Sequence, residues 1–404
     1  MLVSEIDCPE IGDFRIGAGP DTRDLVAPLA AQSWIVKMPF GYILTRHDDC
    51  IAVLKDKRWH QATRLLSQMT PVDNERYQNR QNRQSILTME GDEHTRLRRL
   101  VASAFTPKAA NRLRPFMREV INELLDPVTA SGECEFVSAV CEPYPIPIIC
   151  ELLGAPRQDW EQFSRWATSI FKIFSDRVPE YADEIMDASE EIDAYVLDLI
   201  EQRRGDPRDD LLSDLIAAEE AGEKLSPTEL VMMVEAVILA GTDTTRNQLG
   251  CAIATFADHP DQWAALANDP NLAARATEES FRYLGAIRGT GRFAAEEIEY
   301  RDVVFPEGTL VFPNFVGANH DIDQFSCPHE FDIEAERSGA SHLTLGFGSH
   351  YCLGANLARA ELQEALTICA QRMPNLRLDG EITWKPDGIG IWGPAELPLR
   401  FDPT

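Results

Sequence analysis

The sequence predicts a mainly α fold of the α+β class, one large helical domain with small peripheral β-sheets. Helical periodicity of apolar residues dominates the chain, and the strand-like runs are short and bounded by proline and glycine. With 404 residues and 44% hydrophobic composition, the chain can bury a large core. Length alone would suggest two or three domains. The motifs described below must converge on one site, so we expect a single domain over residues 1–404.

The first expected elements are a β-hairpin and a helix. Residues 34–38 and 42–45 are β-prone runs around a proline and a glycine, and a helical pattern follows near 48–55. Residues 59–88 are rich in Gln, Asn and Arg and predict a long mobile loop, a kind of segment that is often functional.

Helical patterns then recur along most of the chain. They cover residues 91–104, 107–130, 159–175, 182–203, 208–220, 226–257, 260–268, 270–284 and 354–372. Short strands are expected near 292–313 and 381–401, where Pro306-Glu-Gly308 and Pro386-Asp-Gly388 supply turn residues.

Charge and cysteine content exclude several classes of protein. The formal net charge of -28 argues against a nucleic-acid partner, because phosphate backbones need a basic surface. Nine irregularly spaced cysteines without a signal peptide predict a reducing, cytoplasmic location and no disulfide framework. No run of about 18 apolar residues occurs, so we expect no membrane anchor.

The most informative segment is residues 345–359, LGFGSHYCLGANLAR. Its glycines, which include Gly346 and Gly354, allow close approach of a flat ligand, and the apolar spacing after Cys352 predicts a helix. Cys352 would then lie at a helix N-terminus, which lowers the thiol pKa and favours the thiolate that a metal such as iron requires.

A second informative segment lies in the interior of a long helix. Ser226-Pro-Thr-Glu229 is a capping box that begins the helix, and an apolar run continues to residue 239. Residues 240–245, AGTDTT, are poor helix formers whose hydroxyls can bond to carbonyls one turn back. They predict a bent helix with a groove, although relief of packing at a helix crossing would explain the same composition.

The cysteine segment resembles the haem-binding loop of the cytochromes P-450, FGxGxHxCxG followed by LAR. One position departs from the family pattern, because Leu345 replaces its first aromatic residue. The resemblance implies the cytochrome P-450 fold around a buried haem b, with Cys352 as the iron ligand and with altered redox tuning. The missing anchor resembles the soluble bacterial members.

The AGTDTT segment is similar to the oxygen-activation motif of the same family. The resemblance implies that Asp243 is the acid and Thr244 the hydroxyl of a proton-delivery pair, which can relay protons to bound oxygen. Members of the family that use peroxide directly tend to lack this pair.

Further motifs imply anchors for the fold and the cofactor. Glu279 and Arg282 lie on one helix face, and the resemblance pairs them with Arg337 in a structural network. Haem propionates need cations or donors. By resemblance these donors are His94, Arg98, Arg292 and His350. Upstream of Arg292 the family usually has Pro-Val, where this chain has Ala286-Ile287, so the substrate wall is not placed by resemblance there.

The resemblance also implies a mostly apolar substrate pocket. Its expected residues are Ile86, Leu87, Phe171, Phe174, Val237, Ala240, Ile287, Gly289, Ile391 and Trp392. Ordinary core packing would explain each of them equally well. Arg76, Arg80 and Arg83 could meet an acidic substrate, but solvated loop charge is the simpler interpretation.

One segment breaks the acidic character of the chain. Residues 94–118 hold seven Lys or Arg residues and no acid. The ordinary interpretation is a solvated helix face with some arginines paired to acids elsewhere. The functional interpretation is a docking patch for an acidic ferredoxin, formed by Arg99, Lys108, Arg112 and Arg114.

These observations predict a haem-thiolate monooxygenase. It would insert one oxygen atom of O₂ into a hydrophobic small molecule, with electrons that pass from NAD(P)H through a ferredoxin reductase and a ferredoxin, since the chain has no nicotinamide or flavin fingerprint of its own. A peroxide-driven, rearranging or coupling haem-thiolate enzyme and a non-catalytic haem sensor remain alternatives. A zinc site at Cys352 and His350 lacks the further ligands it would need.

Overall fold

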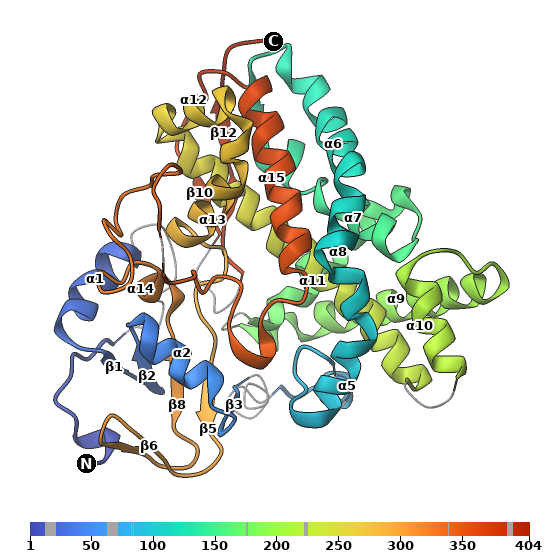
Figure 1. Cartoon of the computed structure of the whole chain (residues 1–404). Helices are drawn as coiled ribbons and strands as arrows, with labels where there is room; N and C mark the ends of the chain where they lie inside the picture. The colour runs from blue at the N-terminus through green and yellow to red at the C-terminus, as the bar shows by residue number, and fades with distance from the viewer. Residues whose placement is uncertain are drawn as a thin grey trace.

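The computed structural model describes residues 1–12, 22–62, 72–81, 83, 85–174, 177–221, 225–337, 339–385 and 391–404. Over this part of the chain the predicted fold class is confirmed, with helices that dominate the molecule and small sheets at its periphery (Figure 1). None of the described helices combines the length and the apolar character that crossing a membrane would require.

The described helices and strands follow one another along the chain in a mixed order. The α-helices are α1 (Thr22–Gln32), α2 (His47–Lys55), α4 (Glu75–Gln81), α5 (Gly91–Val101), α6 (Pro107–Thr129), α7 (Pro145–Leu153), α8 (Trp160–Ile170), α9 (Val178–Gly205), α10 (Leu211–Glu220), α11 (Pro227–Ala257), α12 (Pro260–Asn268), α13 (Ala273–Tyr283), α14 (Phe315–Asn319) and α15 (Ala355–Arg372). The strands are β1 (Ile35–Met38), β2 (Gly41–Leu44), β3 (Trp59–Gln61), β4 (Glu133–Glu135), β5 (Arg292–Ala294), β6 (Ile298–Tyr300), β7 (Val303–Phe305), β8 (Leu310–Pro313), β9 (Arg377–Leu378), β10 (Thr383–Trp384), β11 (Pro394–Glu396) and β12 (Pro398–Arg400).

The largest described sheet has the strand order β1-β2-β8-β5-β3. Strands β2 and β8 are parallel and the other neighbours in this sheet are antiparallel. The three-stranded sheet β4-β12-β9 and the two-stranded sheets β10-β11 and β6-β7 complete the set. The predicted hairpin is confirmed, with Ile35 opposite Leu44 and Met38 opposite Gly41.

Most predicted helices are confirmed to within a few residues, because their caps were visible in the sequence. Ser226 accepts a hydrogen bond from the Glu229 amide, and the Glu229 side chain accepts one from the Ser226 amide, so the predicted capping box begins α11. The predicted helix at 270–284 instead begins as a 3₁₀ turn, Pro270–Leu272, before α13. Helix α9 begins at Val178, four residues earlier than predicted.

The prediction of one long loop over residues 59–88 is wrong in two places. Residues 59–61 form β3, which pairs with β5, and residues 75–81 form α4. Helix α7 was not predicted either, since Pro145 and Pro147 resemble helix breaks. Pro145 occupies the first position of α7, where a missing amide hydrogen costs nothing.

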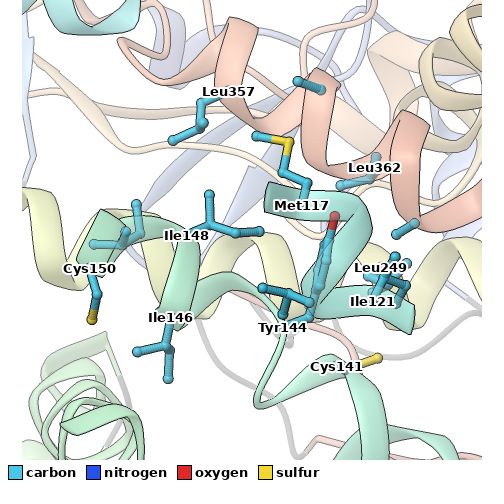
Figure 2. Packing of buried hydrophobic residues seen from close by; sticks show 14 of the residues in the cluster. Met117, Ile121, Cys141, Tyr144, Ile146, Ile148, Cys150, Leu249, Leu357 and Leu362 are labelled. Atoms are coloured by element: carbon cyan, nitrogen blue, oxygen red, sulfur yellow. The ribbon is translucent and has the colours of Figure 1, made fainter. Parts of the chain in front are cut away.

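The main hydrophobic core lies where α6, α7, α11 and α15 meet. Figure 2 shows Met117 and Ile121 of α6 packed with Tyr144 and with side chains of α7, α11 and α15. The buried Tyr144 hydroxyl donates to the Glu361 carbonyl of α15 at 2.9 Å. Each fully buried aliphatic side chain contributes about 1.5–3 kcal/mol, so this core fixes α11 relative to α15.

Candidate functional site

One cavity of about 410 Å³ is lined both by α11 and by the segment that precedes α15. Helix α11 contributes Val237, Ala240 and Thr244, and the other segment contributes Leu345 and Cys352. Two regions that lie about a hundred residues apart in the sequence therefore line one cavity. This is the convergence that the motifs required.

The cysteine loop depends on glycine at two described positions. Gly346 and Gly348 both have φ of 74°, a conformation that other residues rarely adopt. A Cβ atom on Gly348 would lie 2.3 Å from the Leu54 carbonyl oxygen, so the loop packs directly on the end of α2. The Cys352 amide donates to the Leu345 carbonyl at 2.8 Å, which closes the loop and turns Cys352 toward the cavity that it lines.

The predicted lowering of the Cys352 pKa is wrong for the free thiol. Burial raises the pKa of Cys352, and this effect exceeds the opposing effects of the Gly354 amide and of Arg98 and Arg359. Cys352 lies three residues before α15, so it gains one amide donor instead of the full field of the helix end. A bound cation must therefore supply the remaining stabilisation of the thiolate.

Four cationic or hydrogen-donating side chains gather at the wall of the same cavity. They are His94 and Arg98 of α5, Arg292 of β5 and His350 of the cysteine loop. The His94 and His350 rings are stacked, with centroids 4.3 Å apart. Burial and the nearby His94, Arg292 and Arg98 lower the pKa of His350 to about 3, and burial lowers the pKa of Arg292 to about 10.

This wall fits an anionic ligand. Buried groups whose cationic forms are destabilised regain that energy when an anion approaches. The buried Nε2 atom of His350 has no hydrogen-bond partner within the described part of the chain, so it can still bind such a ligand. Together with Cys352 and the glycine-containing loop, these residues fit haem. Its iron needs an axial ligand, and its two propionates carry one negative charge each.

The AGTDTT segment of α11 remains α-helical throughout, and two of its three hydroxyls bond back to the helix as predicted. Thr244 Oγ1 donates to the Ala240 carbonyl at 2.7 Å, and Thr242 Oγ1 donates to the Leu239 carbonyl at 3.1 Å. Thr244 lines the cavity. A Cβ atom on Gly241 would lie 2.2 Å from Ile149 Cδ1, so glycine there lets α7 approach α11 closely.

Asp243 is buried on a different side of α11. Its side chain is 5% exposed and forms an ion pair with Arg246, while Lys385 Nζ lies 3.6 Å from Asp243 Oδ1. Asp243 is not among the described residues that line the cavity. The acid and the hydroxyl are thus adjacent in sequence but face different surroundings.

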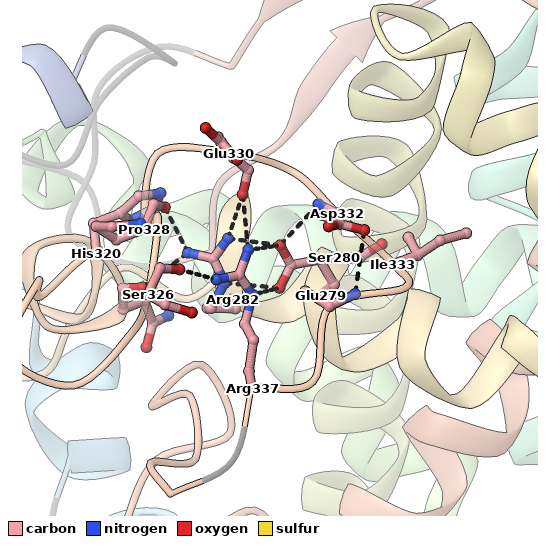
Figure 3. Close-up of polar contacts among 12 residues, drawn as sticks. Glu279, Ser280, Arg282, His320, Ser326, Pro328, Glu330, Asp332, Ile333 and Arg337 are labelled. Carbon is pink, nitrogen blue, oxygen red and sulfur yellow. Dashed lines mark hydrogen bonds and ion pairs between the residues drawn. The ribbon is translucent and has the colours of Figure 1, made fainter.

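Glu279, Arg282 and Arg337 form a buried network (Figure 3). Both guanidinium groups bond to both carboxylate oxygens, at 2.6–2.8 Å. Burial alone raises the pKa of Glu279, but the two arginines outweigh it and hold the pKa below its usual range. Arg282 also donates to the carbonyls of Asn319, Pro328 and Glu330, which ties α13 to the chain before the cysteine loop.

Six of the ten expected pocket residues line the cavity: Ile86, Leu87, Val237, Ala240, Ile287 and Gly289. Three others do not. Phe171 packs against the main core, Ile391 forms a β-bridge with Ile287, and the buried Trp392 stacks on Trp384 with centroids 4.4 Å apart. These three residues pack behind the residues that line the cavity and do not line it themselves. The side chain of Phe174 lies outside the described residues.

Three described arginines of the 59–88 segment make ion pairs within the protein. Arg76 binds Asp187 and Glu190 of α9, and Arg83 binds Asp193 of the same helix. Arg80 binds Asp193 and also the buried Glu235 of α11. The simpler interpretation of solvated charge fits Arg76, whose side chain is 42% exposed, and is wrong for Arg80, whose side chain is 14% exposed. All three side chains already have carboxylate partners within the protein, which an acidic substrate would have to displace.

The basic residues of α5 and α6 divide into two groups. Arg99, Lys108 and Arg112 are exposed, and within the described residues they form no ion pair. Arg114 instead binds Glu364 and Gln363 of α15, at 2.9 and 2.6 Å. Arg114 therefore contributes less to any docking surface than was expected.

Two buried polar residues at the cavity escaped the sequence analysis. Gln248 of α11 and Glu361 of α15 are 3% and 1% exposed, and both line the cavity. Burial raises the pKa of Glu361 to about 8, and its carboxylate accepts a hydrogen bond from Thr245 at 3.0 Å. For Glu361 the available signal was an acidic residue in the otherwise apolar buried stripe of α15.

A cavity that joins a cysteine on a glycine loop, a cationic wall and a helix with an inward hydroxyl defines a haem-thiolate protein. Within the described residues, no cluster of three or more His, Cys, Asp or Glu side chains is placed to hold a bare metal ion. The chain belongs to the cytochrome P450 family, whose model matches residues 155–373.

Known relatives agree with this assignment. The chain is 35% identical to mycinamicin IV hydroxylase/epoxidase of Micromonospora griseorubida, over 90% of this chain and 91% of that protein. It is 36% identical to 6-deoxyerythronolide B hydroxylase of Saccharopolyspora erythraea, over 78% and 77%. The solved structure of the bacillaene polyketide synthase cytochrome P450 PksS of Bacillus subtilis superposes with a TM-score of 0.84 at 30% identity, over 95% and 97%. The chain is a haem-thiolate monooxygenase that uses haem iron and O₂.

Proposed function

We propose that this monooxygenase inserts one oxygen atom of O₂ into a hydrophobic small molecule, with polyketide-derived compounds as the first class to test. The observation that carries the proposal is the shared cavity, in which Thr244 and Cys352 face apolar side chains such as Ile86, Val237 and Ile287. One relative, the bacillaene polyketide synthase cytochrome P450 PksS, carries a polyketide pathway in its name, which supports this class.

In this proposal Cys352 is the axial ligand of haem, and His94, Arg98, Arg292 and His350 bind its propionates. Gly346 and Gly354 let the loop approach the ring. Haem, when bound, supplies the centre at which O₂ is reduced and activated. Leu345 is 9% exposed and lines the cavity, so it covers the sulfur with apolar surface where the family has an aromatic residue.

Proton delivery is assigned to Asp243 and Thr244. Lys385 is partly exposed and lies 3.6 Å from Asp243, so it connects this buried carboxylate to solvent. Thr244 uses its proton to bond the Ala240 carbonyl, which leaves its oxygen lone pairs available to a water molecule in the cavity. A proton can therefore pass from the surface to Asp243 and then, through water, to the cavity at Thr244.

Electrons are proposed to come from NAD(P)H through a ferredoxin reductase and a ferredoxin. The exposed Arg99, Lys108 and Arg112 are offered as the docking residues for the acidic ferredoxin, in a chain whose net charge is otherwise -28. Charge reversal at Arg112 should slow reduction several-fold at low salt and much less at high salt. A reduction rate that does not respond to salt would exclude this surface.

We further propose that the protein is cytoplasmic and that it consists of a single domain. All nine cysteines are unpaired, as expected in a reducing compartment. The cysteine loop and α11, far apart in sequence, complete one cavity, as expected of a single folding unit.

The test is the reduced carbon monoxide difference spectrum of the purified protein, followed by a screen for substrate-induced shifts of the Soret band. A band at the thiolate position supports Cys352 as the axial ligand, and Cys352→His should move it to the histidine position. Product formation with NAD(P)H and redox partners, compared with hydrogen peroxide alone, separates the monooxygenase from a peroxide-driven enzyme. A protein that binds no haem would refute the proposal.

A further inference from the structure

The segment from Ala286 to Thr290 forms one wall of the cavity. It follows α13 and precedes β5, and Ala286, Ile287, Gly289 and Thr290 all line the cavity. No run of regular strand pairing supports it, since Ile287 and Gly289 each form an isolated β-bridge, with Ile391 and Asn314. The position of this wall therefore depends on a few individual hydrogen bonds.

Three main-chain bonds join the wall to other segments. The Trp392 amide donates to the Ala286 carbonyl at 2.9 Å, the Phe315 amide donates to the Arg288 carbonyl at 2.8 Å, and the Thr290 amide donates to the Pro313 carbonyl at 3.3 Å. None of these bonds connects the wall to α11, the helix that carries Thr244.

The bond that makes this connection comes from a side chain. Gln248 Oε1 accepts a hydrogen bond from the Ala286 amide at 2.8 Å. The Gln248 amide group donates to the carbonyls of Ser280 and Leu284, at 3.4 and 3.3 Å. Gln248 lies one helical turn after Thr244 and is 3% exposed. These three hydrogen bonds all reach main-chain atoms of a single stretch, the end of α13 and the start of the wall.

Burying a carboxamide in this position is unfavourable unless its bonds are made, and a buried amide hydrogen without an acceptor is likewise unfavourable. Ala286 has such a hydrogen, whereas a proline at this position would have none. Gln248 and Ala286 are therefore complementary: the side chain satisfies a donor that exists because residue 286 is not proline.

We propose that Gln248 is a positioning residue for substrate, which fixes the Ala286–Gly289 wall relative to Thr244 by its hydrogen bond to the Ala286 amide. The role as substrate wall rests on the function proposed above. The contact between Gln248 and Ala286 and its effect on the wall do not depend on that function.

The experiment uses the holoprotein and four variants: Gln248→Leu, Gln248→Glu, Ala286→Pro and Gln248→Leu/Ala286→Pro. The first readout is hydrogen–deuterium exchange of the 286–290 segment. Exchange at Ala286 should become at least 10-fold faster in Gln248→Leu and change less in Gln248→Glu, which keeps an acceptor. Gln202→Leu, at an exposed glutamine of α9, is the control and should change nothing there.

The second readout is the binding of two azoles, followed by the Soret shift. Imidazole is too small to reach the wall, so its affinity should stay within twofold in Gln248→Leu. The affinity for 4-phenylimidazole, which extends into the cavity, should fall several-fold, and Ala286→Pro should restore it in the Gln248→Leu background because proline removes the unpaired donor.

The third readout is the Tm of thermal unfolding of the same variants. Ala286→Pro should lower Tm in the wild type, where it leaves Gln248 Oε1 without its donor, and lower it less or raise it in Gln248→Leu. Unchanged exchange at Ala286 in Gln248→Leu, or the same effect of proline in both backgrounds, would overturn the proposal. Loss of haem-thiolate spectra in the wild type would refute the proposed function and leave the exchange result intact. A Gln248→Leu protein that does not fold still leaves Gln248→Glu and Ala286→Pro to decide.

Discussion

Arg337 donates to both carboxylate oxygens of Glu279 at 2.8 Å, across 58 residues of sequence. Arg282 also donates to both oxygens of the same carboxylate, so one buried anion holds two cations (Figure 3). This network joins α13 to the segment that leads into the cysteine loop. Its strength should therefore determine whether the loop is formed.

Arg282→Ala should prevent stable incorporation of haem. The substitution leaves Glu279 with one partner in a buried site, and breaking a buried pair in this way costs about 3–5 kcal/mol. The haem-to-protein absorbance ratio and urea denaturation measure the effect. Arg275→Ala on the same helix is the control, because its partner Glu336 lies 3.8 Å away and is exposed, which makes the pair worth at most about 1 kcal/mol. A stable holoprotein from Arg282→Ala would contradict the structural role of the network.

Thr244→Ala should uncouple reductant consumption from product formation. The substitution removes the cavity-facing hydroxyl without disturbing the helix, whose α-helical hydrogen bonds do not need it. The measurement is the ratio of NAD(P)H consumed to product formed, which should rise several-fold while the carbon monoxide spectrum is unchanged. Thr242→Ala removes a neighbouring hydroxyl that bonds the Leu239 carbonyl and is not a described cavity residue, so its coupling should stay normal. Equal coupling in both variants would remove Thr244 from proton delivery.

Glu361 should make the folded state less stable as pH rises from about 5 to 8. Burial raises the pKa of Glu361 to about 8, above the ordinary value of 4.5, so in this window the folded protein keeps a proton that the unfolded chain has lost. Unfolding therefore releases a proton, and this group lowers stability by about 1.4 kcal/mol for each pH unit until the folded form also ionises. Glu361→Gln removes the proton release, so its stability relative to the wild type should increase steadily toward pH 8. Denaturant unfolding at pH 5, 6, 7 and 8 gives the comparison, and two parallel curves would mean that Glu361 is ionised in the folded protein.

Arg80→Ala should destabilise the packing of α4 against α9 and α11. The substitution leaves the buried Glu235 of α11 without its arginine, and burial already raises the pKa of Glu235. We expect a loss of about 3 kcal/mol, partly recovered in Arg80→Ala/Glu235→Gln because the amide carries no charge. Arg76→Ala breaks exposed pairs with Asp187 and Glu190 and should cost less than about 1 kcal/mol. Thermal unfolding of the wild type and the three variants measures these losses. No recovery of stability in the double variant would show that Glu235 does not need Arg80 as its ion-pair partner.

Much of the site could be predicted because its residues carry constraints that are local in sequence. Gly346 and Gly348 adopt a φ that few other residues tolerate, and the Ser226–Glu229 capping box begins α11 through contacts within four residues. Such features act over one turn of chain, so their spacing survives in the sequence as a pattern.

Other parts of the site depend on which distant groups meet, and they could not be predicted. The spacing of Arg76, Arg80 and Arg83 is ordinary for a solvated helix. These arginines gain acidic partners only because α4 and the residues after it approach α9 and α11. Trp392 is a residue of the type that often lines apolar pockets, but its ring stacks on Trp384 behind the wall. Burial likewise reversed the expected pKa shift of Cys352, since desolvation depends on the whole surroundings of a group.

The sequence by itself determined the helical fold, the cysteine loop, the AGTDTT segment and the identity of the residues around them, because each rests on backbone conformation or capping within a few residues. The tertiary structure alone decided that Asp243 faces Lys385 while Thr244 faces the cavity, and that Gln248 reaches Ala286. The physical reason is that hydrogen bonds and desolvation between distant segments depend on ångström-scale distances that packing of the core sets, and no local pattern encodes those distances.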